Sequence, residues 1–341
     1  MKQNIIFIFP GQASQYIGMG KDLYENSSRA RAVMDKVTEL DGLSHIRELC
    51  FEGPADLLTR TDNVQPAITT VSLMALAGLK EAIGQEESIN LNGMLKACAG
   101  HSLGEYAAYV AAGILSEATV MKLVSWRGRW MNEAAQPPYP TGAMLAVIGI
   151  GVGVLQNLVE KLGKDRIALA NINSHSQIIL SGTREAIFQA EEAVKTIGAK
   201  KTVILNVSGA WHSPLMIPAE AKMKELIQSE LTPESVSLNG DVLVVANVTA
   251  NEVKDYNEVK HTLTRQVTSP VNWVDSVQRM CDLCGNKSDG KEADVMPLFV
   301  EVGPGRVLRG LMRGIDRKLE VINVDDMEGV ENLTNRLRKD N

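Results

Sequence analysis

The sequence is poor in the residues that mark several classes of protein. Only four of its 341 residues are cysteines, and aromatic residues make up 4% of the chain. Four cysteines are too few for a disulfide framework in a chain of this size, which favours a reducing, cytoplasmic setting. Acidic residues outnumber basic ones and give a formal net charge of -6, which argues against a general nucleic-acid binder.

Two local patterns raise the question of a metal site or a membrane segment. Cys281 and Cys284 form a C-x-x-C pair, but no second pair and no histidine cluster follows, so we predict no zinc site. The stretch 141–159 has no charged residue, yet its glycines favour a strand, a break and a helix over a membrane span. The apolar run at 5–9 is too short for the core of a signal peptide. We therefore expect no metal and no membrane contact.

The order of the expected elements predicts two packed units. Apolar residues make up 45% of the chain, and about 150 residues per domain gives roughly two units. Alternating strand-like and helix-like segments predict an α/β protein. Residues 128–205 have the order βαββαβ, which is typical of a ferredoxin-like subdomain. We predict that it is inserted into a hydrolase-like catalytic domain with a parallel central sheet, formed by 1–127 and 206–341.

Each expected element has approximate bounds. Strands are expected at 4–9, 96–99, 143–150, 167–173, 177–181, 201–207, 241–248, 297–302 and 320–323. Helices are expected at 22–37, 54–59, 66–83, 103–113, 116–133, 154–161, 184–197, 214–231, 258–268, 273–283 and 307–312, with a polar surface loop at 285–294.

The strongest chemical signal is Gly100-His101-Ser102-Leu103-Gly104, which matches the G-x-S-x-G nucleophile elbow. A short apolar strand precedes it and an alanine-rich helix follows, as such an elbow requires. The turn would present the Ser102 hydroxyl at a helix N-terminus, where the Leu103 N–H can point at an oxyanion. The alternative is a tight turn with a structural role only.

A serine nucleophile needs a base, and the chain has five histidines. His212 follows an apolar strand and a short loop, which favours a place facing an active-site cleft. Composition alone prefers it only modestly to His101 and His261. No acid stands out between Ser102 and His212, and much of the chain follows His212. The order serine, acid, histidine of the α/β-hydrolases therefore fits poorly.

Eight short motifs occur in order along the chain. They are Phe9-Pro10-Gly11-Gln12-Ala13-Ser14-Gln15, Asp62-Asn63-Val64-Gln65-Pro66, Gly100-His101-Ser102-Leu103-Gly104-Glu105-Tyr106, Arg127-Gly128-Arg129-Trp130-Met131, Gly142-Ala143-Met144, Ala210-Trp211-His212-Ser213-Pro214-Leu215-Met216, Asn247-Val248-Thr249-Ala250 and Glu301-Val302-Gly303-Pro304-Gly305. As a set they resemble the malonyl-CoA:acyl-carrier-protein transacylase family, which is related to the acyltransferase domains of polyketide synthases. The resemblance covers nearly the whole chain, including the inserted subdomain.

The resemblance implies catalytic roles for particular residues. Ser102 would be the nucleophile that becomes acylated, and His212 the general base. A backbone carbonyl near Gln266 would orient His212 in place of an acid, which would account for the missing aspartate. The backbone N–H groups of Gln12 and Leu103 would form the oxyanion hole.

Arg127 would be the specificity residue by resemblance, and its chemistry agrees. Malonyl carries a free carboxylate, which a guanidinium binds through two parallel hydrogen bonds. With acetyl the arginine would stay unpaired, so such a site can reject acetyl strongly. The alternative is a solvated helix arginine, which is the interpretation we give Arg129. We expect Gln65 and Asn173 to help order the pocket.

The implied reaction is a ping-pong transfer of malonyl from malonyl-CoA, through a malonyl-serine ester, to the phosphopantetheine thiol of acyl carrier protein. It would supply fatty-acid synthesis and need no cofactor. A freestanding acyltransferase of a polyketide pathway would use the same chemistry. An acyl hydrolase that clears carrier proteins is a further alternative, although it has no need of a carboxylate clamp such as Arg127.

The expected partner is acidic, although the chain itself has a net charge of -6. Docking would then require a local basic patch near the cleft. The candidates are Lys200, Lys201, Arg306, Arg309 and Arg313, and the alternative is ordinary solvated surface charge. We expect a cytoplasmic monomer that binds malonyl-CoA and acyl carrier protein but no nucleic acid.

Overall fold

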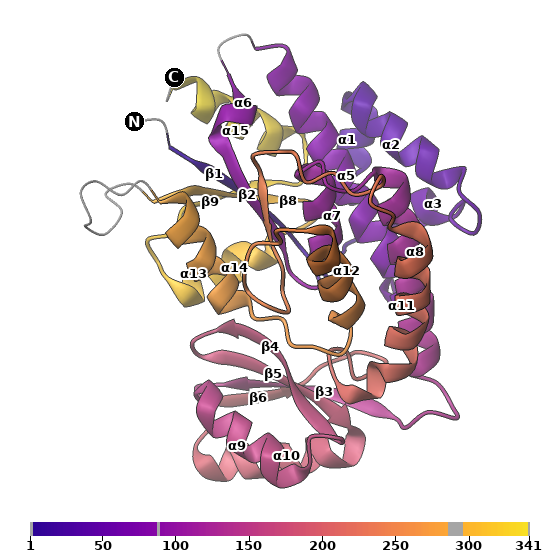
Figure 1. Ribbon diagram of the computed structural model, residues 1–341, viewed down its shortest axis with the longest axis vertical. Helices are drawn as coiled ribbons and strands as arrows, with labels where there is room; N and C mark the ends of the chain where they lie inside the picture. Colours follow the sequence, from indigo (N-terminus) through magenta and orange to yellow (C-terminus); the bar gives the residue numbers. More distant parts are fainter. Residues whose placement is uncertain (1–2, 87–88, 286–295, 340–341) are drawn as a thin grey trace.

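The large sheet forms the centre of the molecule (Figure 1). The computed structural model describes residues 3–86, 89–285 and 296–339. The sheet contains, in spatial order, β7 (Leu243–Val245), β2 (Leu95–Gly100), β1 (Ile5–Phe9), β8 (Leu298–Val302) and β9 (Val321–Val324). All neighbouring strands pair in parallel, so the predicted parallel central sheet is confirmed.

Helices cover both faces of this sheet, which explains why β1 is an unbroken apolar run. Ile5, Phe7 and Phe9 pack into the larger core cluster, and Ile6 and Ile8 pack into the cluster on the opposite face. The helices of this domain are α1 (Lys21–Asn26), α2 (Ser28–Thr38), α3 (Ile46–Phe51), α4 (Ala55–Thr59), α5 (Thr61–Gly84), α6 (Leu91–Met94), α7 (Gly104–Ala111), α8 (Glu117–Ala134), α11 (Ile217–Glu230), α12 (Tyr256–Arg265), α13 (Trp273–Cys284), α14 (Val307–Ile315) and α15 (Met327–Lys339). A short 3-10 turn, η1 (Pro214–Met216), precedes α11.

The helix α5 is long and apolar enough to cross a membrane, but 72% of its most apolar window is buried inside the protein. It packs mainly against α2 and α8 and is the central helix of the larger core cluster. It begins at Thr61, five residues before its predicted start at Pro66. Pro66 lies inside the helix, in its second turn, where it lacks the N–H that would bond the Asp62 carbonyl.

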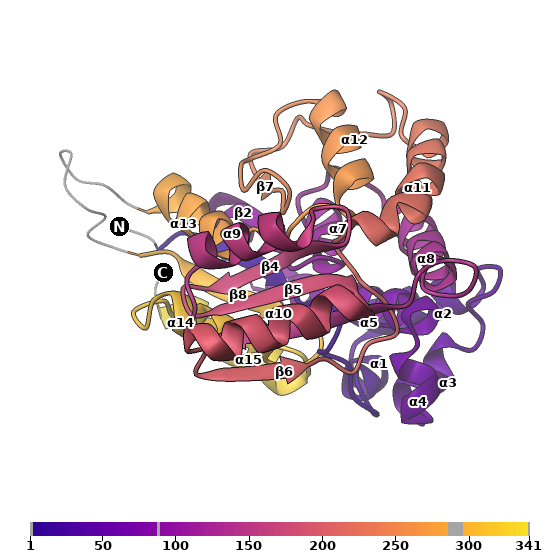
Figure 2. The same cartoon turned by 90° about the horizontal axis from the view of Figure 1, so that it is seen from below.

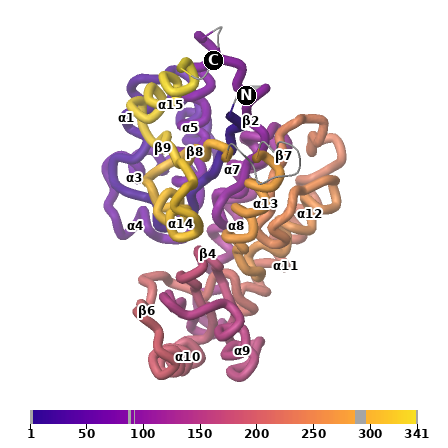
Figure 3. The backbone as a smooth tube through the Cα atoms, turned by 90° about the vertical axis from the view of Figure 1, so that its left-hand side faces the viewer, coloured from indigo at the N-terminus to yellow at the C-terminus, as the bar shows by residue number. Residues whose placement is uncertain are grey.

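The small sheet is antiparallel and lies at one end of the molecule (Figure 3). Its strands are ordered β4 (Ile167–Ser174), β5 (Gln177–Thr183), β3 (Gly142–Ile148) and β6 (Lys201–Ile204). The helices α9 (Val152–Leu162) and α10 (Arg184–Ile197) cover its outer face (Figure 2). Along the chain the order is βαββαβ, so the predicted ferredoxin-like unit is confirmed.

The small sheet packs on the large domain through one face and also pairs with it at one edge. Its inner face packs on α8 and η1 through a cluster that includes Met144, Met131 and Met216. In addition, the edge strand β4 forms a single bridge with Val271. The Ile172 N–H donates to the Val271 carbonyl at 2.9 Å, and the Val271 N–H donates to the Ala170 carbonyl at 2.8 Å. The small sheet is therefore tied to the segment that follows α12.

Some predicted bounds differ from the structure. The predicted helix at 22–37 is two helices, because Ser27 adopts an extended backbone and accepts a hydrogen bond from the Ala30 N–H at the start of α2. The helices α3, α6 and α15 were not predicted. The limits of the subdomain, 128–205, stay a prediction: its strands and helices lie within 142–204, and α8 crosses residue 128. The predicted loop at 285–294 falls almost wholly outside the described residues.

Candidate active site

Ser102 lies in a tight turn between β2 and α7, the strand–turn–helix setting of a nucleophile elbow. Its φ of 50° is in the left-handed region that non-glycine residues rarely adopt. The turn also needs glycine on both sides of the serine. A Cβ at Gly100 would overlap the backbone of Gly104, and a Cβ at Gly104 would overlap the carbonyl of Phe9. The motif therefore holds a half-buried serine in a strained turn.

His212 contacts the serine directly. Ser102 Oγ lies 2.7 Å from His212 Nε2. On the other side of the ring, Nδ1 lies 2.9 Å from the Gln266 carbonyl oxygen and 3.0 Å from that of Ser269. Because carbonyl oxygens only accept hydrogen bonds, Nδ1 carries the proton and Nε2 is the acceptor for the Ser102 hydroxyl. Two backbone carbonyls thus orient the histidine where a hydrolase would use an acid.

The electrostatic surroundings keep His212 neutral. Burial first, and then the nearby Arg127 charge, lower its pKa to about 3, although the carbonyls of Gln266 and Ser269 oppose the shift. A neutral imidazole can accept a proton. The ring is therefore in the state that a general base requires at neutral pH.

Arg127 is only 1% exposed, which excludes the solvated alternative. Its Nη1 donates to Gln65 Oε1 at 2.7 Å, and its Nη2 donates to Ser102 Oγ at 3.0 Å. Nε has no hydrogen-bond partner, and no carboxylate of the described chain forms an ion pair with this guanidinium. Arg129 differs, since it is partly exposed and stacks on Trp126. The site therefore holds a buried positive charge without an ion-pair partner beside the serine.

The two expected oxyanion donors have no competing acceptor. The Ser102 N–H donates to Asn247 Oδ1 at 2.7 Å, so it is not available to an oxyanion. Within the described part of the chain, neither the Gln12 N–H nor the Leu103 N–H donates a hydrogen bond. Leu103 follows the serine, and Gln12 follows β1, the strand beside β2. Both N–H groups therefore remain candidates for the oxyanion hole.

His101 and Asn173 form a separate contact at the edge of the site. His101 Nε2 lies 2.8 Å from Asn173 Oδ1, and its ring packs edge-on against Trp273. Neither residue hydrogen-bonds Ser102 or Arg127. His101 is thus held away from the base position that His212 occupies.

Asn247 and Glu105 occur in two of the sequence motifs, but no local pattern assigns them a role. Asn247 lies two residues after the end of β7, which pairs with β2, and its side chain bonds the turn around Ser102. Glu105 is fully buried in α7 and accepts from the Asn247 N–H. The available signal was position, because polar residues at the carboxyl ends of adjacent parallel strands lie close together.

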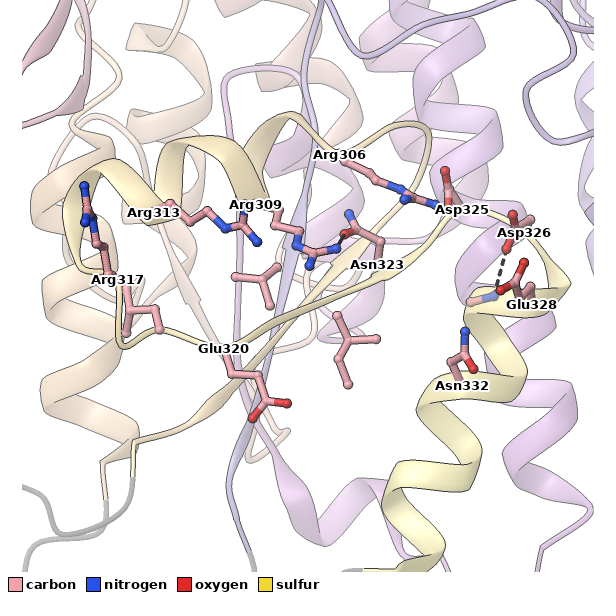
Figure 4. A pocket seen from close by; sticks show the side chains of 14 residues that line it. Arg306, Arg309, Arg313, Arg317, Glu320, Asn323, Asp325, Asp326, Glu328 and Asn332 are labelled. Atoms are coloured by element: carbon pink, nitrogen blue, oxygen red, sulfur yellow. Dashed lines mark hydrogen bonds between the residues drawn. The ribbon is translucent and has the colours of Figure 1, made fainter.

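The candidate basic patch is divided between two parts of the molecule. Lys200 and Lys201 lie at the start of β6 in the small sheet. The arginines line a cavity of about 530 Å³ between α14 and β9, and acidic side chains line its other walls (Figure 4). The basic residues there are Arg306, Arg309, Arg313 and Arg317, and the acidic ones are Glu320, Asp325, Asp326 and Glu328. Opposite charges therefore face each other across this cavity.

Comparison with known proteins gives consistent matches over the chain. The family model of the acyl transferase domain matches residues 6–283. A malonyl CoA-acyl carrier protein transacylase of Bacillus subtilis (strain 168) is 38% identical over 339 residues, which cover 99% of this chain and 98% of that protein. One from Staphylococcus aureus (strain MRSA252) is 33% identical over 326 residues, which cover 95% and 96%.

Solved structures agree with these matches. The crystal structure of an acyl-carrier-protein-S-malonyltransferase from Bartonella henselae has a TM-score of 0.85 and 34% identity, and the match covers 98% of this chain and 99% of that one. A malonyl-transacylase solved in complex with a type II polyketide-synthase acyl-carrier protein has a TM-score of 0.84 and 28% identity, with the same coverage.

Proposed function

This chain belongs to the acyl transferase domain family, and we propose that it transfers malonyl from malonyl-CoA to the phosphopantetheine thiol of an acyl carrier protein for fatty-acid synthesis. The names of its relatives support this substrate pair. The observation that carries the proposal is the buried Arg127 guanidinium, 3.0 Å from Ser102 Oγ. It supplies a positive charge where the free carboxylate of a malonyl group on Ser102 would lie.

In the first half-reaction, Ser102 Oγ attacks the thioester carbonyl carbon of malonyl-CoA while His212 Nε2 takes its proton. The N–H groups of Gln12 and Leu103 stabilise the resulting oxyanion. The carbon–sulfur bond then breaks, and the coenzyme A sulfur leaves with the proton from His212. The products are free coenzyme A and a malonyl ester on Ser102.

In the second half-reaction, the carrier protein's thiol gives its proton to His212 and its sulfur attacks the ester carbonyl. The bond to Ser102 Oγ breaks, and the serine regains the proton from His212. Each bond change uses the same base and the same oxyanion donors. We therefore propose a reaction without a cofactor.

Selectivity would come from Arg127. The malonyl carboxylate can replace the Ser102 hydroxyl as a partner of the guanidinium, with two parallel hydrogen bonds. An acetyl group would leave the guanidinium without an anion in a buried site. The site would therefore discriminate against acetyl, because an unpaired buried polar group is costly.

Intact mass after separate incubation with malonyl-CoA and acetyl-CoA tests this proposal. We expect a malonyl adduct that Ser102→Ala abolishes, and little or no acetyl adduct. Arg127→Ala should lower malonyl loading by about 100-fold and raise acetyl loading relative to malonyl. An adduct that survives Ser102→Ala would disprove the nucleophile. Equal loading of acetyl would disprove the clamp, and adducts that vanish by hydrolysis would favour the hydrolase alternative.

The same chemistry could serve a polyketide pathway, and one solved structural neighbour is bound to a polyketide carrier protein. Loading rates with a fatty-acid and a polyketide carrier protein would separate the two functions. For the enzyme itself we propose a cytoplasmic monomer. Its four free cysteines suit a reducing compartment, and its exposed large apolar side chains are scattered over both domains.

We propose that Arg306, Arg309 and Arg313, at the start of α14 and along it, dock the acidic carrier protein. Arg309 Nη1 already contacts Asn323 Oδ1, and Arg306 faces Asp325, so Arg313 is the freer cation of the three. Arg313→Glu should raise the KM for carrier protein about tenfold at low salt, and less at high salt, without changing loading from malonyl-CoA. Lys224→Glu, on α11, is the matched control. Equal KM values for the two variants would exclude this docking face.

A further inference from the structure

Glu105 is a fully buried carboxyl group in the first turn of α7, three residues after the nucleophile. Its Oε2 accepts a hydrogen bond from the Asn247 N–H at 2.8 Å. Its Oε1 has no hydrogen-bond partner, and no basic side chain of the described residues forms an ion pair with it. Glutamate is rarely buried in this way without a paired charge, so its position requires an explanation.

The hydrogen bond from Asn247 connects Glu105 to the turn that carries the nucleophile. Asn247, whose backbone it holds, accepts from the Ser102 N–H at 2.7 Å and donates from Nδ2 to the Gly100 carbonyl at 2.6 Å. These two backbone groups lie on either side of the strained turn. Asn247 therefore fixes the turn from both ends, and Glu105 fixes Asn247.

Gln266 connects the turn around Ser102 to the base, His212. The Gln266 side chain donates from Nε2 to the Ser102 carbonyl at 3.1 Å, and the Gln266 backbone carbonyl accepts from His212 Nδ1 at 2.9 Å. Burial raises the pKa of Glu105 to about 7, while hydrogen-bonding groups of Asn247 and Gln266 oppose that rise. The carboxylate thus hydrogen-bonds Asn247, and Gln266 contributes to its electrostatic surroundings.

We propose that Glu105 is a positioning residue for acyl transfer, which holds the turn that carries Ser102 in place for His212 through Asn247. This inference rests on the proposed function, because it assigns a part in the same reaction. Glu105 touches neither the serine hydroxyl nor the imidazole. Its removal should therefore slow the chemical step without weakening the binding of malonyl-CoA.

Glu301 offers a matched control in the same sheet. It is also fully buried, and its carboxylate accepts hydrogen bonds from the Leu308 N–H at 2.8 Å and the Arg309 N–H at 2.9 Å. Burial raises its pKa as well. Glu301 holds the start of α14 and has no hydrogen bond to the residues around Ser102. Its substitution should cost stability without affecting acylation.

The experiment measures acylation of the full-length enzyme by malonyl-CoA in rapid-quench mode, together with the midpoint of thermal unfolding. For Glu105→Ala we expect a maximal acylation rate about 100-fold lower, with half-saturation by malonyl-CoA within about threefold of wild type. Glu105→Gln keeps an oxygen that can accept from Asn247 and should recover the rate to within about tenfold. Glu301→Ala should lower the unfolding midpoint but leave the rate within about twofold.

Asn247→Asp tests the same network if Glu105→Ala does not fold. A neutral aspartic acid can accept from the Ser102 N–H and donate to the Gly100 carbonyl, whereas an aspartate cannot donate. The variant's rate relative to wild type should therefore rise at least tenfold as pH falls from 8.5 to 6. The other titratable groups near this position, Glu105, His212 and Arg127, are common to both enzymes and largely cancel in that ratio.

The outcomes separate the two proposals. A wild-type enzyme that forms no malonyl adduct would overturn the proposed function. A wild-type enzyme that loads normally, with a Glu105→Ala variant that loads as fast as Glu301→Ala, would overturn only the positioning role. A ratio of Asn247→Asp rate to wild-type rate that does not change with pH would also overturn the positioning role.

Discussion

Two turns at the carboxyl edge of the same sheet solve the same geometric problem in different ways. Both join a buried parallel strand to a helix: β2 to α7, and β8 to α14. The second turn places glycines in the left-handed region, Gly303 at a φ of 129° and Gly305 at 78°, whereas the first places Ser102 there at 50°. The comparison teaches that the second turn confines its left-handed positions to glycine, whereas the first accepts backbone strain at the residue that carries the reactive hydroxyl.

The buried glutamates beside the two turns, Glu301 and Glu105, differ in how fully their carboxylates are hydrogen-bonded. Both oxygens of Glu301 accept hydrogen bonds, whereas Glu105 leaves Oε1 without a partner. Unsatisfied buried polar groups are rare in proteins and tend to be found at functional sites. The β8–α14 turn is thus built for stability, and the β2–α7 turn gives up part of that stability to chemistry.

The largest expected effect concerns the glycines of the two turns. Gly104→Ala would force a Cβ into the backbone of Phe9, so we expect a loss of about 4 kcal/mol or more in the free energy of unfolding. Gly305→Ala meets the Ser14 carbonyl oxygen at 2.9 Å and needs a left-handed backbone, so the loss should be about 2 kcal/mol. Urea unfolding of both variants measures the difference. Equal losses would show that the elbow is no more constrained than the other turn.

The next prediction concerns how the rate of acylation depends on pH below 6. Because the pKa of His212 is lowered to about 3, the imidazole stays neutral, and able to accept a proton, until pH approaches that value. Acylation should therefore change by about twofold or less between pH 6 and pH 4.5. A histidine with an ordinary pKa of about 6.5 would lose more than tenfold over this range. Such a loss, measured as kcat/KM for malonyl-CoA on folded enzyme, would contradict the burial argument.

The smallest effect isolates the strain at Ser102. Ser102→Ala and Ser102→Gly both remove the hydroxyl, but only glycine relieves the left-handed backbone. We expect Ser102→Gly to be about 1 kcal/mol more stable than Ser102→Ala, or roughly 2–4 °C in the unfolding midpoint. At Gly303 the same order should hold, with Gly303→Ala less stable than the native glycine. Thermal unfolding of the three variants decides whether the strain is real.

Much of the fold could be predicted from the sequence, because it rests on local patterns. The apolar runs of β1 and β2 and the βαββαβ order of the small sheet predict their own elements. The helix α15 carries such a pattern as well, since Val330, Leu333 and Leu337 are spaced to share one buried face. The split between α1 and α2 depends on a single capping serine.

The site residues also form two groups: those that local sequence marks, and those that only the order of the strands brings together. Ser102 is marked by its own turn, and Arg127 and His212 are marked by motifs, and the structure places the three side chains together. The contacts of Glu105 and Asn247 could not be derived, because they depend on β7 lying beside β2. The sequence alone does not determine this order of strands.

The single bridge between β4 and Val271 limits how this protein could be recombined with its relatives. Gln266 and Ser269, whose carbonyls orient His212, lie just before Val271, so one short segment holds both the base and the edge of the small sheet. A chimaera that exchanges only the small subdomain would join a foreign β4 to a native 266–271 segment and shift the imidazole. Exchanges that move this segment together with the subdomain would preserve both contacts.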